Sequence, residues 1–91
     1  MKQTPKRWNK REKQLSLELK CKDFKQAIAL LVSIGDIAEE HNHHPDVAIK
    51  NYNLVFISIT THDAGTLTDK DYRLAQSITD FLDSQGKSAK I

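Results

Sequence analysis

The chain has 91 residues, a net charge of +2, 38% hydrophobic residues and 29% charged residues, which is the composition of one soluble globular domain. It contains a single cysteine, Cys21, which excludes an internal disulfide framework and a CxxC metal or redox site. No apolar run approaches the roughly 20 residues that a membrane span needs, and the first residues do not resemble a signal peptide. We therefore expect a cytoplasmic protein with no membrane partner.

Positive charge is concentrated at the start of the chain. Residues 1–25 contain nine Lys or Arg and three acids, a net +6, whereas residues 26–91 contain five and nine, a net −4. A basic leading segment could contact nucleic acid or an acidic surface, but its composition favours a solvated, flexible segment over residues 1–14. Trp8 is the only aromatic residue of this segment, and the sequence does not predict where its side chain docks.

The first predicted elements are a strand and a helix. Apolar and polar residues alternate over Leu15–Cys21, which is typical of a half-buried antiparallel strand. Asp23 is a suitable N-cap for a helix over Phe24–His41. Gly35 inside this helix costs about 1 kcal/mol relative to alanine, and a close packing contact would explain its presence. The expected buried face comprises Phe24, Ala27, Ile28, Leu31, Val32 and Ala38.

A hairpin is predicted after the first helix. The helix must end before Pro45, and Asn42 is a suitable terminating residue. A short strand over residues 47–50 is followed by Asn51–Asn53, which has the composition of a turn. Residues 54–62 are rich in β-branched side chains and give the strongest strand prediction.

A second helix is expected from Thr68 to Gly86, with Asp71 three residues after Thr68 as in a capping box. Residues 87–91 are expected to form a frayed tail, so that residues 15–86 make up the single domain. The expected buried face comprises Tyr72, Ala75, Ile78 and Leu82, flanked by Leu74 and Phe81.

The element order is therefore strand, helix, strand, strand, helix, and the sequence weakly supports a further short strand near Trp8–Glu12. This order predicts an α+β fold, with a small antiparallel sheet of three to four strands and two α-helices packed on one face. Such a sheet leaves open edge strands, which edge-to-edge pairing between copies would cover. We therefore expect a homodimer or homotetramer.

All four histidines lie within 22 residues, three of them at residues 41–44 and the fourth, His62, at the end of the long strand. Because the predicted hairpin folds back on itself, the end of its second arm should return close to the start of its first. His62 is therefore expected near His43 and His44. These two neighbours should point in different directions, because the following proline biases His44 to an extended conformation.

Three interpretations of this cluster remain open on spacing alone. Imidazoles have an unperturbed pKa of about 6.5 and suit acid–base catalysis, and two of them in one pocket can hold different protonation states. The same residues could instead form a satisfied structural pair in a polar loop. They could also bind zinc with an open fourth position, although the chain has no HExxH motif and a His-His-Pro turn is poorly shaped for two ligands on one ion.

The spacing of these residues resembles the pterin-4a-carbinolamine dehydratase family. The family pattern is an acidic residue, three residues, His-His-Pro, five or six residues, an aromatic residue, nine residues, His, about eight residues and Asp. The longer spacing of six is present here, which would shift the hairpin register or form a bulge. The resemblance extends over residues 15–83, and the pattern is met by Glu39, His43-His44-Pro45, Tyr52, His62 and Asp71.

The resemblance implies a hydro-lyase that dehydrates 4a-hydroxytetrahydropterin to quinonoid dihydropterin, in tetrahydrobiopterin recycling beside an aromatic amino acid hydroxylase. It implies no cofactor and no metal, because the pterin nitrogens stabilise the developing cation. The catalytic residues that it implies are His43, His44 and His62, with His43 and His62 as the acid–base pair. The pocket residues that it implies are Asn42, Thr60, Thr61 and Asp63, and the supporting residues are Glu39, Asp71 and Tyr52.

The supporting residues have alternative explanations in the sequence. Glu39 lies one helical turn before His43 and could orient it. Asp71 could act as a helix cap or orient a histidine, and Tyr52 could pack at the hairpin turn or stack on the pterin ring. The resemblance also implies a second role, because some members act as dimerisation cofactors of a transcription factor through their helices. The three intact histidines favour the enzyme over such a non-catalytic binding module.

Overall fold

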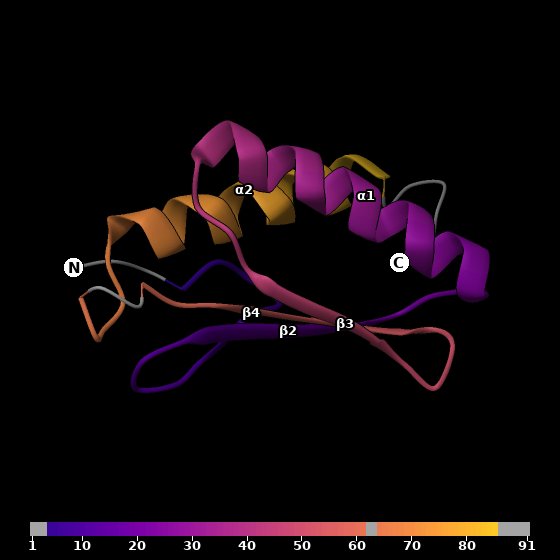
Figure 1. Ribbon diagram of the computed structural model, residues 1–91, viewed down its shortest axis with the longest axis horizontal. Helices are drawn as coiled ribbons and strands as arrows, with labels where there is room; N and C mark the ends of the chain where they lie inside the picture. The colour runs from indigo at the N-terminus through magenta and orange to yellow at the C-terminus, as the bar shows by residue number, and fades with distance from the viewer. Residues whose placement is uncertain (1–3, 62–63, 86–91) are drawn as a thin grey trace.

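The computed structural model describes residues 4–61 and 64–85, and it has the α+β fold that the sequence predicts. Two helices lie on the same face of a four-stranded antiparallel sheet (Figure 1). The elements in chain order are β1 (Asn9–Lys10), β2 (Leu15–Lys20), α1 (Phe24–His41), β3 (Asp46–Lys50), β4 (Leu54–Ile59) and α2 (Asp69–Gln85).

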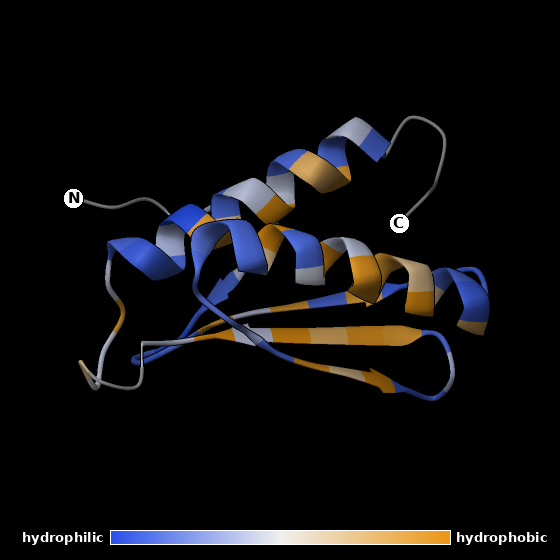
Figure 2. Ribbon diagram, turned by 45° about the horizontal axis from the view of Figure 1, so that its top comes forward, coloured by the Kyte–Doolittle hydropathy of each residue, from blue (hydrophilic) through white to orange (hydrophobic). Residues whose placement is uncertain are grey.

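The strand order in the sheet is β1-β2-β4-β3. The central strands β2 and β4 pair along their whole lengths, from Leu15 opposite Ile59 to Lys20 opposite Leu54. The two-residue strand β1 is the weakly supported strand of the sequence analysis, and it pairs only with the start of β2. Within the described sheet, β1 and β3 are therefore the edges, and the apolar core lies between β2, β4 and the two helices (Figure 2).

Helix α1 has the predicted bounds, but its predicted buried face is wrong in part. The side chains of Phe24, Ile28 and Val32 remain 52%, 44% and 62% exposed, and we call these three residues the α1 stripe. Apolar residues cover more than half of the helix circumference, so the periodicity could not indicate which side packs. The residues that α1 does bury are Ala27, Leu30, Ile34 and Ala38.

Both ends of α1 are capped by the predicted residues. The Asp23 side chain accepts a hydrogen bond from the Gln26 N–H at 2.8 Å, and Asn42 takes a left-handed conformation directly after the helix. Gly35, in contrast, does not make the close contact that we predicted, because a Cβ added there would meet no atom within 4 Å. Packing within the described chain therefore gives no steric reason for this glycine.

Strands β3 and β4 form a hairpin around the turn Asn51–Asn53. Asn51 and Tyr52 both have positive φ angles, of 51° and 58°. The pairing of the two strands is continuous over Asp46–Lys50, so the additional residue of the long spacing does not form a bulge, which was one of the two expected outcomes. Tyr52 lies at the tip of this turn, where 61% of its surface is exposed.

Helix α2 buries most of its predicted face and two polar residues in addition. Leu74, which we expected to flank the face, is wholly buried, whereas Tyr72 is only partly buried. The predicted end at Gly86 and the predicted tail lie outside the described residues. Neither α1 nor α2 is long and apolar enough to cross a membrane. The residues that α2 buries are Asp71, Leu74, Ala75, Ile78, Thr79 and Leu82.

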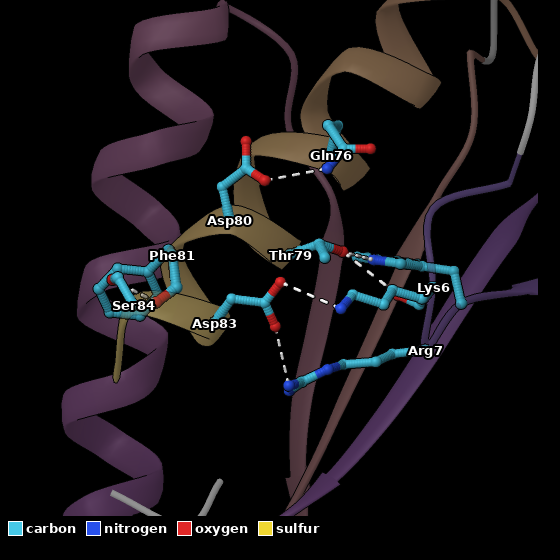
Figure 3. Close-up of polar contacts among 9 residues, drawn as sticks. Lys6, Arg7, Gln76, Thr79, Asp80, Phe81, Asp83 and Ser84 are labelled. Atoms are coloured by element: carbon cyan, nitrogen blue, oxygen red, sulfur yellow. Dashed lines mark hydrogen bonds and ion pairs between the residues drawn. The ribbon is translucent and has the colours of Figure 1, made fainter. Parts of the chain in front are cut away.

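Part of the leading segment that we expected to be flexible is packed on α2. The indole of Trp8 is buried, and its Nε1 donates a hydrogen bond to Thr79 Oγ1 at 2.9 Å. Lys6 and Arg7 both reach Asp83, with N···O distances of 3.6 and 3.0 Å (Figure 3). The start of the described chain is therefore attached to its last helix by one core side chain and two ion pairs.

Candidate active site

Three elements end together at one end of the sheet. The C-terminus of α1, the C-terminus of β4 and the N-terminus of α2 all lie at the left of Figure 1. Each contributes a side chain to one chain of contacts: His43 follows α1, Thr61 follows β4, and Asp71 lies in the first turn of α2. The hairpin therefore returns the end of β4 to the histidine loop, as its predicted geometry requires.

The C-terminal cap of α1 determines where His43 lies. The N–H of Asn42 donates to the Glu39 carbonyl at 3.1 Å, and the N–H of His43 donates to the Ala38 carbonyl at 3.2 Å. These two hydrogen bonds and the left-handed Asn42 form a Schellman motif. The motif reverses the chain direction, so His43 approaches α2. The Asn42 residue itself is exposed.

Asp71 is the buried centre of the site, with none of its side chain exposed. Its Oδ1 lies 2.7 Å from His43 Nε2. Its Oδ2 accepts one hydrogen bond from the Thr68 N–H at 2.8 Å and another from the Thr61 hydroxyl at 2.7 Å. The bond from Thr68 is one half of a capping box, the half in which the side chain three residues into the helix accepts from the N-cap N–H. Asp71 therefore both caps α2 and contacts a histidine, the two roles that the sequence left as alternatives.

His44 points to the other side of the loop. Its Nε2 lies 2.6 Å from Glu39 Oε2, and both side chains are exposed. The prediction that His43 and His44 diverge is therefore confirmed. The expectation that Glu39 orients His43 is wrong, because Glu39 contacts His44 while Asp71 contacts His43. Within residues 4–61 and 64–85, no three potential metal ligands come together.

Two other predicted site residues lie away from this cluster. Thr60 donates its hydroxyl to the Lys13 carbonyl, and so faces the turn between β1 and β2. Tyr52 belongs to the turn between β3 and β4. This turn lies at the opposite end of the sheet from the end of α1 (Figure 1), and the five residues of β3, about 17 Å of strand, separate the two. Tyr52 is therefore too distant to stack on a ligand bound beside His43 of the same chain. Two further predicted residues, His62 and Asp63, lie outside the described residues.

The sequence indicates Thr68 only as the start of a helix, but its hydroxyl is also part of the site. Its Oγ1 lies 2.8 Å from Thr61 Oγ1. Thr61 gives its one hydroxyl proton to Asp71, so the proton between the two threonines must come from Thr68. The capping box was the available signal, because it fixes the start of the helix beside the Asp71 carboxylate.

The Asp71 contact fixes which nitrogen of His43 holds a proton. A carboxylate only accepts hydrogen bonds, so His43 Nε2 is the donor, and Nδ1 of the neutral ring keeps its lone pair. The His43 side chain is 12% exposed, so part of it is in contact with solvent. The arrangement can therefore take a proton at Nδ1 and stabilise the resulting imidazolium through Asp71.

Comparison with known proteins gives a consistent family match. A sequence model of the family described as Pterin 4 alpha carbinolamine dehydratase matches residues 1–81. A protein of Saccharolobus islandicus, provisionally named pterin-4-alpha-carbinolamine dehydratase, is 50% identical over 69 residues, which are 76% of this chain and 69% of the relative. A relative from Cyanothece sp. with the same provisional name is 46% identical over 72 residues, which are 79% of this chain and 73% of the relative.

Two solved structures have a similar fold. A transcriptional coactivator/pterin dehydratase from Brucella melitensis superposes with a TM-score of 0.74 at 26% identity, covering 84% of this chain and 82% of that protein. A pterin dehydratase-like protein, identified as a RuBisCO assembly factor in the α-carboxysome, superposes with a TM-score of 0.63 at 16% identity, covering 81% and 84%. The second likeness concerns the fold alone.

Proposed function

This chain belongs to the pterin 4 alpha carbinolamine dehydratase family, and from this premise we propose that it dehydrates a 4a-hydroxytetrahydropterin to a quinonoid dihydropterin. The observation that carries the proposal is the 2.7 Å contact between His43 and the wholly buried Asp71. A buried carboxylate behind an accessible imidazole is the arrangement that a histidine acid–base catalyst needs.

The proposed reaction consists of two proton transfers with no change in oxidation state. The C4a–O bond breaks, and its electron pair leaves with the oxygen, which takes up a proton and departs as water. The lone pair of the adjacent ring nitrogen forms the new C=N bond, and that nitrogen gives its proton to a base. Imidazoles suit both transfers near neutral pH.

Within this proposal, His43 is the base and accepts the ring-nitrogen proton at Nδ1. Asp71 is a positioning residue, because its carboxylate accepts a hydrogen bond from the His43 Nε2–H and so leaves Nδ1 without a proton. His62, the second histidine of the sequence pattern, delivers the proton to the leaving hydroxyl. His44 contacts the substrate from the exposed side of the loop, supported by Glu39.

Stopped-flow absorbance of freshly generated 4a-hydroxytetrahydropterin, with and without the protein, tests the proposal. His43→Ala and His62→Ala are each expected to lower turnover by about 10²-fold or more, the scale of one acid–base group. His41→Gln is the matched control, because His41 lies in the same histidine-rich stretch but contacts Ser77 on α2. Wild-type turnover in both alanine variants would contradict the catalytic assignment.

We also propose a cytoplasmic location and a place in tetrahydropterin recycling beside an aromatic amino acid hydroxylase. Cys21 supports the location, because it is the one cysteine of the chain and it is buried. Burial raises the pKa of its thiol, and the negative charge of Asp23 raises it further. A lone, protonated thiol of this kind fits a reducing compartment.

A second candidate function is a non-catalytic binding or assembly role on the same fold. The observation that favours it is the exposed α1 stripe, since three large apolar side chains on one helix face are suited to packing against another protein. The fold-level likeness to a RuBisCO assembly factor is compatible with such a role. Retained turnover in the stopped-flow assay would favour the enzyme, and its absence would favour the binding role.

A further inference from the structure

A cavity of about 640 Å³, wide open to solvent, lies beside the hydrogen-bonded cluster at the start of α2. Two of its lining residues, Thr61 and Thr68, also belong to the chain of contacts that ends on His43. Asp71 alone lies between these threonines and His43 in that chain of contacts. The lining residues are Thr61, Ala64, Thr68, Asp69, Lys70 and Arg73.

We propose that this cavity binds an anionic tail of the pterin, a phosphate ester or a carboxylate, while the ring reacts beside His43. The inference rests on the proposed function and specifies which pterins the site prefers. Two observations carry it: the direction of the hydrogen bonds in the cavity wall, and the two cations among the lining residues.

The threonine hydroxyls of the wall can accept hydrogen bonds from a ligand but have no proton left to give. Thr61 donates its proton to Asp71, and Thr68 must then donate its proton to Thr61. The remaining lone pairs on the two oxygens favour hydroxyl or N–H groups of the ligand and disfavour a negative charge. An anionic group is therefore expected at the cationic side of the cavity, away from these hydroxyls.

The cationic side is formed by Lys70 and Arg73, which lie three residues apart and hence on one face of α2. Arg73 has a long contact to Asp69, 3.9 Å between Nη2 and Oδ2, and both side chains are exposed. Exposed ion pairs of this kind have a small interaction free energy. The Arg73 guanidinium can therefore still bind a phosphate or carboxylate with two hydrogen bonds. Lys70 has no ion-pair partner among the residues that the structure describes.

The test compares 4a-hydroxytetrahydropterins that differ only in the tail: a neutral dihydroxypropyl tail, the same tail phosphorylated, and a tail ending in glutamate. We expect the wild-type KM to be about tenfold lower for an anionic tail, the size of one charge-assisted hydrogen bond. Lys70→Gln and Arg73→Gln should each remove most of this preference, measured as the ratio of the KM values for the neutral and the anionic tail. The phosphate and glutamate arms show which anion the cavity selects.

Lys20→Gln is the matched control, because Lys20 is an exposed lysine on β2, outside the cavity. Equal KM values for all three tails in the wild-type protein would overturn the inference. An anionic preference that survives both cavity variants would overturn it as well.

A binding measurement separates this inference from the proposed function. Titration with an unreactive 7,8-dihydropterin, with and without a phosphorylated tail, should show about tenfold tighter binding of the phosphorylated form, lost in Arg73→Gln. If the pterin with the neutral tail is turned over but the protein binds all tails equally, the tail site is wrong and the dehydratase proposal stands. If no pterin is turned over but the phosphorylated analogue binds as expected, the tail site stands and the dehydratase proposal is wrong.

Discussion

The Asp71 carboxylate determines the chemistry of His43 through its two oxygens. Oδ2 is occupied by the Thr68 N–H and the Thr61 hydroxyl, both of which donate. In Asp71→Asn the amide oxygen must stay on that side, so the amide NH₂ faces His43 Nε2. His43 must then move its own proton to Nδ1, the nitrogen that the proposed reaction needs free.

We therefore expect Asp71→Asn to fold normally and to lose about 10²-fold or more in turnover. The ¹⁵N chemical shifts of His43 should show protonation moving from Nε2 to Nδ1, which a merely structural role of Asp71 would not produce. Asp80→Asn is the control, because Asp80 is an exposed acid of the same helix that contacts Gln76. Unchanged turnover together with unchanged shifts would rule out the positioning role.

The pairing of carboxylates with histidines shows where residue-level prediction reaches its limit. The sequence identified both members of the His43–Asp71 contact, but the four-residue spacing on a helix favoured Glu39 as the partner of His43. The left-handed Asn42 ends the helical spacing one residue before His43 and turns that residue toward α2. A local pattern could not show this, because the correct partner is 28 residues away.

At the scale of elements, the end of α1 depends on the backbone conformation of Asn42, with φ 51° and ψ 40°. Asparagine and glycine adopt this region readily, whereas alanine is strained there by about 1 kcal/mol. Asn42→Ala should therefore lower the free energy of unfolding by about that amount, and Asn42→Gly should be nearly neutral. Urea unfolding of the three proteins measures the difference, and equal loss in both variants would argue against backbone strain.

The bounds of α1 were predictable because helix caps depend on local sequence. Asp23 and Asn42 are local capping signals, and both act as the sequence predicts. The buried face was not predictable, because the α1 stripe and the true core positions are both apolar, and the packing of α1 on α2, β3 and β4 distinguishes them. The hairpin was similarly unpredictable, because the long spacing allowed either a shifted register or a bulge, and only the strand pairing distinguishes them.

At the scale of the whole molecule, the α1 stripe and the open edge of β3 remain uncovered within the described chain. Burying an apolar side chain of this size contributes roughly 1.5–3 kcal/mol, so we expect copies of the 10.4 kDa chain to associate. Val32→Glu should shift the protein toward the monomer, because it adds a charge to the stripe. Ala29→Glu, at an exposed position on the polar face of α1, should leave the assembly unchanged.

Sedimentation at micromolar concentration measures this assembly. A wild-type protein that sediments as a monomer would contradict the expected association. An oligomer that Val32→Glu and Ala29→Glu affect equally would instead remove the α1 stripe from the interface and leave the β3 edge as the contact.

The attachment of the leading segment to α2 was beyond sequence reasoning, since Trp8 and Thr79 are 71 residues apart. It also makes Trp8, the single tryptophan of the chain, an intrinsic fluorescence probe of whether α2 is packed against the leading segment. Any opening that detaches α2 exposes the indole to water and moves its emission to the red. During translation, the same indole cannot reach its site until α2 has left the ribosome.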